Sequence, residues 1–518
     1  MNELYKNLGF NDNPFSRFSA EEEREYLNDI FQNPKYFQTI LTDIKEGRTR
    51  FIVGERGIGK SALMFRLKEE LENEKVLTLL IDRFDNFKIK SNERDFLIEV
   101  IKQLVNFISI LAFTDKSIIK KLTKFEKEKL AFFISEFFDT LSKSELERIY
   151  NNTTKYKNTN FIKNIYNIFF SKPVNIVISA TSETISDTVR KSLGFGGGLS
   201  EEFYKQYIPE FKLTGIGEKS NILDVVDVKK CKEFLEDILS ISKNCGFRKV
   251  AVFFDKIDEY PTLSGNITNI TEFIQDIALD TNLLHMEDIS FVFVIWSKVK
   301  NSLNNTGVRF DKFKPIDITW TDEELRNIVE KRLGYFSNEQ VVISDIIRSE
   351  DEIKKVINLA YKSPRHMIML LSRVYDEQDR ISNNVKSFDS VALFNGYHQF
   401  ITNFDYPSLY PGKASRKDYI ITVINKILRL RKLEFEVKDW IAEYKISTQK
   451  TSGEIKIIRE YALITEIDNP GSPTKKYKVI EPRLKYLIEN GISKIGNEAN
   501  EDLDLTLETN DEYALIDV

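Results

Sequence analysis

The sequence predicts an α/β fold with a parallel β-sheet, and three observations lead to this prediction. Apolar runs bounded by charged residues recur along the chain, as expected for strands buried on both faces of a parallel sheet. A glycine-rich turn joins the first run to an amphipathic helical pattern over residues 62–71. A later run ends in an aspartate. The predicted strands span residues 50–53, 76–82, 249–255, 289–296 and 315–320.

The glycine-rich turn has the pattern G-x-x-x-x-G-K-S, in which backbone N–H groups wrap a polyphosphate. In this pattern the Lys60 ammonium meets the β- and γ-phosphates, and the Ser61 hydroxyl ligates Mg²⁺. The flanking strand and helix disfavour a turn without a ligand. The fold class is therefore predicted to be that of a P-loop NTPase, with ATP and Mg²⁺ bound. The expected nucleotide-contacting residues are Gly54, Glu55, Arg56, Gly57, Ile58, Gly59, Lys60, Ser61 and Ala62.

Composition and length favour a soluble globular protein of about three domains. The chain has 518 residues, of which 42% are hydrophobic and 30% are charged. No run approaches 18 apolar residues, and the N-terminus lacks an apolar signal core, so we expect no membrane span and a cytoplasmic location. The two cysteines, Cys231 and Cys245, fit a reducing compartment. Three scattered histidines argue against a His-based zinc site.

Helical periodicity outside the strands predicts how the chain is organised. A mainly helical insertion interrupts the core, with helices over 95–111, 124–141 and 161–170 and a strand over 174–180. The glycine cluster at 194–198 is interpreted as a mobile loop or hairpin rather than as a second phosphate cradle. The predicted parts are a helical lead-in (1–49), the ATPase core (50–335) with its insertion (about 88–248), a helical lid (336–385), a linker (386–414), a C-terminal module (415–494) and an acidic tail (495–518).

The C-terminal module has the pattern of a winged helix, with three helices followed by a two-stranded hairpin. The helices are predicted over 418–433, 437–444 and 452–461, the strands over 463–467 and 475–480, and a short closing helix over 482–488. Residues 416–494 hold 17 basic and 11 acidic side chains, a balance of +6, whereas residues 495–518 hold eight acids and no Lys or Arg. Solvated faces and a disordered tail are the simpler explanation of this asymmetry.

Further acidic residues complete the predicted chemistry. Asp255 ends the strand Phe253-Phe254, which is the Walker B form, and is placed to hold Mg²⁺. ATP hydrolysis needs an acid that polarises the attacking water, and many ATPases have a glutamate directly after this aspartate. Here that position is Lys256, so the role falls to Asp258 or Glu259 or is weak. Both acids could also be ordinary residues at a helix N-terminus.

The run Asp255-Lys256-Ile257-Asp258-Glu259 resembles the Walker B of STAND and KAP ATPases, within the wider AAA+ and origin-recognition-like class. The resemblance covers roughly residues 35–100 and 245–490. It implies that Ser297, after the fourth strand, senses the γ-phosphate, and that Arg365 in Ser363-Pro364-Arg365 contacts the phosphates from the lid. It also implies that Arg309 acts as an arginine finger. Ser297 could equally be a plain strand-end residue, and Arg309 a surface arginine.

Two functions follow from these observations. The first is an ATP-driven switch that self-associates, with roles in DNA transactions or bacterial defence implied by the resemblance. The winged helix could contact duplex DNA through Lys456, Arg459 and the hairpin lysines Lys475, Lys476 and Lys478, or it could dock a protein. The insertion is the expected site for a protein partner. The second function is a nucleotide-gated binding module with negligible hydrolysis, for which Lys256 is the discriminating feature.

Overall fold

The computed structural model describes residues 3–84, 87–88, 90, 92–138, 182–208, 226–263, 266–409, 414–468 and 474–496. The chain divides into two compact units. The first unit comprises Met1–Ser372 and Ser382–Phe388, and the second comprises Arg373–Ile381 and Asp389–Val518. Each unit has its own sheet.

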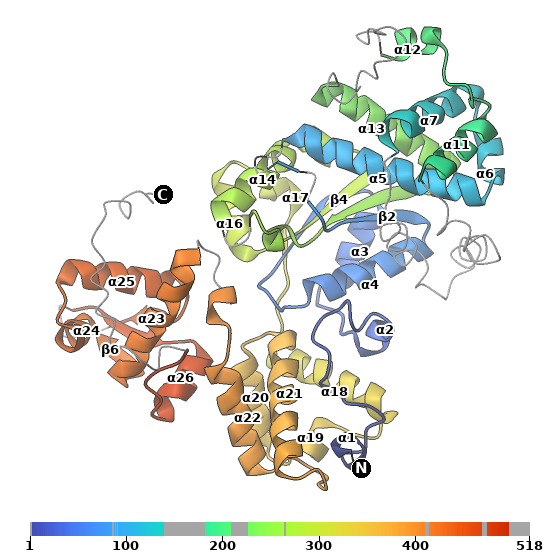
Figure 1. Cartoon of the computed structure of the whole chain (residues 1–518). Helices are drawn as coiled ribbons and strands as arrows, with labels where there is room; N and C mark the ends of the chain where they lie inside the picture. Colours follow the sequence, from blue (N-terminus) through green and yellow to red (C-terminus); the bar gives the residue numbers. More distant parts are fainter. Residues whose placement is uncertain are drawn as a thin grey trace. The chain divides into compact units, whose positions relative to one another are not determined.

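A parallel five-stranded sheet organises the first unit (Figure 1). Its strand order is β2-β3-β4-β1-β5, so β4 lies between the strand that precedes the phosphate loop and the strand that ends at Asp255. The register pairs Val53 with Ile295 and Phe254 with Phe293, which brings the carboxyl ends of the three central strands to one edge. The strands are β1 (Arg50–Val53), β2 (Val76–Ile81), β3 (Lys249–Phe254), β4 (Ile289–Ile295) and β5 (Ile316–Asp317).

Helices cover both faces of this sheet, which explains why its strands are apolar throughout. On one face Phe254 packs against Phe96 of α5 (Glu93–Thr114), and Phe96 packs against Phe273 of α14 (Ile267–Leu279). On the other face lie α3 (Phe37–Lys45) and α4 (Lys60–Asn73) (Figure 1). The predicted α/β class with a parallel sheet is confirmed. The last strand is shorter than predicted, because only Ile316 and Asp317 pair with β1.

The described part of the insertion is helical, as predicted. Its helices are α5, α6 (Ser117–Lys121), α7 (Lys124–Phe137), α11 (Ser182–Leu193), α12 (Glu201–Tyr207) and α13 (Val228–Asn244). Phe132 forms ring contacts with Phe234 and Tyr207, so aromatic packing joins α7, α12 and α13. The glycine cluster at 194–198 lies in the turn between α11 and α12. The helix predicted over 161–170 and the strand predicted over 174–180 lie outside the described residues.

Among the described residues, α5 alone is long and apolar enough to cross a membrane by length and composition. However, 67% of its apolar stretch is buried within the protein, where it contacts α7, α11, α13 and α14. These contacts show that α5 is a core helix, which explains its apolar surface.

The N-terminal segment and the predicted lid complete the first unit. The predicted helical lead-in is not helical over most of residues 20–30, since only α2 (Leu27–Ile30) is α-helical there. Ser19 and Glu22 exchange the hydrogen bonds of a capping box, but the backbone after them forms turns up to Leu27. The physical reason is tertiary, because the Arg332 guanidinium holds both the Arg17 carbonyl and the Glu23 carboxylate. The remaining helices are α1 (Leu4–Asn7), α15 (Thr281–Leu284), α16 (Ser297–Asn305), α17 (Phe310–Phe313), α18 (Asp322–Ser337), α19 (Ile343–Ile346), α20 (Glu350–Ala360) and α21 (Pro364–Ile381), of which residues 364–372 belong to the first unit.

The second unit contains a helical module with a small antiparallel sheet of order β6-β8-β7. Its predicted helices and both hairpin strands are present, and β6 is an additional strand. The segment predicted as a linker contains a helix, α22. The elements are α22 (Ser390–Thr402), the 3₁₀ turn η3 (Tyr406–Leu409), α23 (Ala414–Leu430), β6 (Glu434–Glu436), α24 (Val437–Tyr444), α25 (Thr448–Glu460), β7 (Ile464–Ile467), β8 (Lys476–Val479) and α26 (Pro482–Glu489).

Candidate nucleotide-binding site

The glycine-rich loop connects β1 to α4 at the carboxyl edge of the sheet. Gly57 and Gly59 have φ values of +78° and +96°, which L-residues with a side chain rarely adopt, so the loop geometry requires glycine there. The Lys60 ammonium donates to the carbonyl oxygens of Gly54 and Glu55 at 2.8 and 3.0 Å. Burial lowers the pKa of Lys60 below its usual value. A buried cation whose hydrogen-bond acceptors are backbone carbonyls is well placed to exchange these contacts for an anion.

The two predicted Mg²⁺ ligands lie together. The Ser61 hydroxyl donates to a carboxylate oxygen of Asp255 at 3.0 Å, although 194 residues separate them. Asp255 is only 4% exposed, and burial raises its pKa to about 6. A carboxylate and a hydroxyl are hard oxygen ligands, which is the chemistry that Mg²⁺ prefers. The residues present therefore fit this ion, whose charge would favour the ionised form of Asp255.

The two candidate water-polarising acids occupy different environments. Asp258 is 8% exposed, and the Arg56 guanidinium of the loop donates to its carboxylate and to its backbone carbonyl, each at 3.1 Å. Arg56 also lies over the ring of Trp296, 5.0 Å from the centroid. Glu259, by contrast, is exposed and lines the adjacent cavity. In this arrangement the Asp258 carboxylate is hydrogen-bonded to Arg56 of the loop, whereas the Glu259 side chain is accessible from the cavity.

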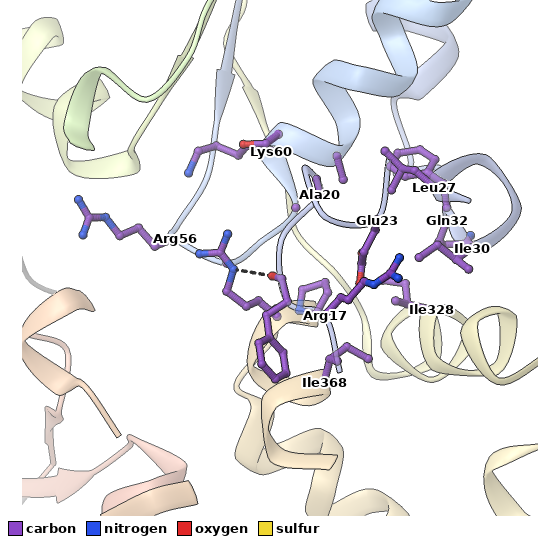
Figure 2. A pocket seen from close by; sticks show the side chains of 18 of the residues that line it. Arg17, Ala20, Glu23, Leu27, Ile30, Gln32, Arg56, Lys60, Ile328 and Ile368 are labelled. Carbon is purple, nitrogen blue, oxygen red and sulfur yellow. Dashed lines mark hydrogen bonds between the residues drawn. The ribbon is translucent and has the colours of Figure 1, made fainter. Parts of the chain in front are cut away.

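A cavity of about 150 Å³ adjoins the loop and extends under the N-terminal segment. Figure 2 shows Glu23, Leu27, Ile30 and Gln32 grouped on one side of it and Lys60 on the other. An apolar region beside a phosphate loop is the environment that a nucleobase needs. Sequence reasoning did not identify this region, because no motif marks the residues that form it. Its apolar side chains are Leu27, Ile30, Phe31, Ile328 and Ile368.

The N-terminal end of α21 contacts the loop directly. The Ser363 hydroxyl and the Arg365 backbone N–H both donate to the Gly57 carbonyl, at 3.1 and 3.3 Å. The Arg365 side chain lines the cavity and donates to the Phe18 carbonyl at 3.2 Å. Trp320 also contacts the loop, since its indole N–H donates to the Ile58 carbonyl at 2.8 Å. The structure thus brings Arg365 to the cavity, and its contact with the phosphates stays a prediction.

Two other predicted residues lie elsewhere. Ser297 begins α16, is half-buried and is not among the described residues that line the cavity. The aromatic residue before it is nearer the loop, because the Trp296 indole N–H donates to the Glu55 carboxylate. Arg309 is exposed, lies outside the cavity lining and forms a bidentate ion pair with Asp311 at 2.8 and 2.7 Å. Within one chain, neither Ser297 nor Arg309 belongs to the cavity.

The cations of the C-terminal module are paired with carboxylates of the same module. Glu466 bridges Arg459 and Lys475, each at 3.1 Å. Glu434 pairs with Lys476 at 2.8 Å and with Lys478 at 3.7 Å. Two carboxylates therefore offset two of the five positive charges that the sequence analysis assigned to this surface. Lys456 of α25 lies one helical turn before Arg459.

The strand order, the loop after β1 and the carboxylate after β3 define the fold as that of a P-loop NTPase. No family of known proteins matches the sequence, and neither does any curated protein. Solved structures with a similar arrangement include the Walker-type ATPase PABY2304 of Pyrococcus abyssi, with 13% identity, a TM-score of 0.39 and coverage of 91% of this chain and 96% of that chain.

Two further structures are the Aeropyrum pernix ORC2 protein and Drosophila ORC bound to DNA, each 10% identical. The first has a TM-score of 0.37 and covers 93% of this chain and 98% of that chain. The second has a TM-score of 0.31 and covers 93% and 90%.

Proposed function

We propose that this chain is an ATP-binding and ATP-hydrolysing molecular switch of the AAA+/STAND type. The observation that supports the proposal most strongly is the placement of Lys60, Ser61 and Asp255 around one cavity that has an apolar side. Lys60 supplies the cation for the phosphates, and Ser61 with Asp255 supplies oxygen ligands for Mg²⁺. When bound, Mg²⁺ neutralises negative charge on the phosphates.

The apolar side of the cavity supports a nucleoside triphosphate rather than a simpler polyphosphate. Leu27 and Ile30 come from the N-terminal segment, whereas Ile328 and Ile368 come from α18 and α21. A base bound between them would hold the segment and the two helices together. Binding energy from the base would therefore order groups that also contact the phosphate loop, which is the property a switch needs.

Glu259 is the better candidate for polarising water in the hydrolysis step. It lines the cavity without the guanidinium contact that engages Asp258. Asp258 then serves to position Arg56 and the loop. Glu259→Gln should lower turnover at least about a hundredfold, as expected for loss of a general base, and leave ATP affinity within about threefold of wild type. Asp258→Asn should instead change ATP affinity, because it releases Arg56.

The corresponding experiment measures steady-state ATP hydrolysis and ATP binding by wild type, Lys60→Ala, Glu259→Gln and Asp258→Asn. Turnover in wild type that is lost in Lys60→Ala and Glu259→Gln supports the switch with hydrolysis. ATP binding without turnover in wild type, with binding lost in Lys60→Ala, supports the second candidate, a nucleotide-gated binding module. Lys256, at the position where many ATPases have the catalytic glutamate, is the observation that favours this second candidate.

Self-association would bring Arg309 to a neighbouring nucleotide. Its exposure and its distance from the cavity of its own chain suit a residue that acts in trans. We expect ATP to increase the molar mass seen by light scattering in wild type. Arg309→Ala should reduce turnover without reducing ATP affinity. Equal turnover in wild type and in this variant, at concentrations where the oligomer forms, removes Arg309 from the mechanism.

We also propose that the C-terminal module is a winged helix that contacts duplex DNA. The proposal is supported by the order of helices and strands and by the cations on β8 and α25. Because Glu434 and Glu466 already pair with these cations, DNA must compete with them, and the affinity should be modest and salt-dependent. Lys475→Gln with Lys476→Gln should reduce the slope of log affinity against log salt by about 2. An unchanged slope assigns DNA binding, if any, to another surface.

A further inference from the structure

The residue after Asp255 is a cation that faces the same cavity. Lys256 lines this cavity together with Lys60, Ser61 and Asp255. Its backbone is left-handed, with φ 59° and ψ 21°, a conformation that residues with a side chain rarely adopt. The structure thus places a second lysine in the lining of the cavity that also contains the predicted phosphate-binding lysine.

Lys256 forms an ion pair with a carboxylate of the N-terminal segment. A carboxylate oxygen of Glu21 lies 2.7 Å from the Lys256 ammonium. The neighbouring residues Phe18, Ala20 and Glu23 line the cavity, so this ion pair joins the rim of the cavity to the end of β3. The two side chains are 41% and 34% exposed, and ion pairs with this exposure are weak. An anion that enters the cavity can therefore displace Glu21.

The positive charge of Arg365 also stabilises the ionised form of the Glu21 carboxylate. Burial raises the pKa of Glu21, but its hydrogen bond with Lys256 and the charges of Lys256 and Arg365 lower it below the usual value. Glu21 is thus an anion near two cavity-lining cations, one after β3 and one from the start of α21. The Arg365 guanidinium also donates to the Phe18 carbonyl, three residues before Glu21. The terminal phosphate of a nucleotide carries more negative charge than a carboxylate, so it would attract Lys256 and Arg365 more strongly than Glu21 does.

We propose that Lys256 contacts the terminal phosphate of ATP and that Glu21 is the internal anion that this phosphate displaces. The inference rests on the proposed ATP site and adds to it a determinant of specificity for ATP over ADP. ADP lacks the γ-phosphate and leaves the Glu21–Lys256 pair intact. ATP breaks the pair and frees residues 17–24 around Glu21, whereas Leu27 and Ile30 hold the base of either nucleotide. Residues 17–24 therefore report which nucleotide is bound.

The test is equilibrium binding of ATP and of ADP, each with Mg²⁺, by isothermal titration calorimetry. Lys256→Gln should weaken ATP binding about five- to tenfold and leave ADP binding unchanged. Glu21→Gln should strengthen ATP binding about threefold, again without changing ADP binding, because the competing anion is gone. In the double variant Glu21→Gln should have no further effect. Glu25→Gln, an exposed charge change in the same segment, and Lys312→Gln, an exposed lysine, are the matched controls.

Trypsin cleavage after Arg17 and Arg24 gives a second readout. We expect faster cleavage with a non-hydrolysable ATP analogue than with ADP, and equal rates for the two nucleotides in Lys256→Gln. Equal effects of either substitution on ATP and ADP, or additive effects in the double variant, would overturn the inference. Failure of the proposed ATP site is a different result, because wild type would then bind neither nucleotide and Lys60→Ala would change nothing.

Discussion

Arg332 holds the N-terminal segment against α18, and its removal is the sharpest test of how the cavity is built. Its guanidinium donates to the Pro14 carbonyl, donates to the Arg17 carbonyl at 3.1 Å and pairs with Glu23 at 2.5 Å. The side chains of Arg332 and Glu23 are only 5% and 11% exposed. Burial raises the pKa of Glu23 even though Arg332 opposes this shift. Arg332→Met therefore leaves a buried carboxylate without its cation.

Breaking a buried ion pair from one side costs about 3–5 kcal/mol, and we expect Arg332→Met to destabilise the first unit by this amount. Glu23→Gln should cost less, about 1–3 kcal/mol, because a guanidinium can still bind the amide oxygen and both carbonyls. The double variant should lose about 1–3 kcal/mol less than the sum of the single losses, since neither charge is then left alone. ATP binding should weaken about tenfold in Arg332→Met, because binding must then order the loosened segment.

The assay combines urea unfolding, followed by intrinsic fluorescence, with calorimetric ATP titration for each corner of this double-mutant cycle. Arg326→Met is the matched control: Arg326 lies on the same helix, and its ion pairs with Glu350 at 2.8 Å and Glu330 at 3.6 Å are partly exposed. It should cost less than about 1 kcal/mol and leave ATP affinity unchanged. Strictly additive effects of Arg332→Met and Glu23→Gln, or an unchanged ATP affinity in Arg332→Met, would refute this account of the cavity.

Two other predictions concern the loop and the insertion. Gly57→Ala should weaken ATP binding at least about tenfold. The φ of Gly57 is +78°, and the added methyl would lie 2.6 Å from the Ser363 hydroxyl. A calorimetric ATP affinity equal to that of wild type would contradict the loop geometry. Burial and the neighbouring Asp280 raise the pKa of Glu93 to about 7 beside Lys232. Because the folded protein holds this proton more tightly than the unfolded chain, stability falls as the pH rises from about 4.5 through 7. Glu93→Gln should therefore raise the free energy of unfolding at pH 8 by about 1–2 kcal/mol and have little effect at pH 4.5. Equal shifts in thermal unfolding temperature at pH 8 and pH 4.5 would exclude a link between Glu93 protonation and stability.

The sequence predicted the central sheet well, because the physical signals are local. Strands buried on both faces are apolar at most positions, and a glycine-rich turn with a lysine and a serine has few other uses. Knowing that parallel strands end at one edge was enough to predict Asp255 near Ser61. The three-residue strand β6 was missed because Glu434-Phe435-Glu436 is too short for a periodic pattern.

The rest of the candidate site depends on contacts between distant residues. Arg332 and Pro14 are 318 positions apart, and Trp320 and Ile58 are 262 apart. Neither contact has a motif, so the sequence could not show that side chains between residues 17 and 32 form one wall of the cavity. The same tertiary contacts explain why the predicted strand over 315–320 stops at Asp317. Beyond that point Trp320 turns to the phosphate loop instead of continuing the sheet.

The central claim is that the loop from Gly54 to Ser61 binds Mg²⁺–ATP, and tryptophan fluorescence tests it most directly. Trp296 and Trp320 both donate hydrogen bonds to the loop, so a bound nucleotide that moves the loop must change their emission. We predict a saturable change on titration of wild type with ATP and Mg²⁺. The change should be absent in Lys60→Ala at an unchanged thermal unfolding temperature. Absence of binding in wild type, or equal binding in Lys60→Ala, would contradict the account.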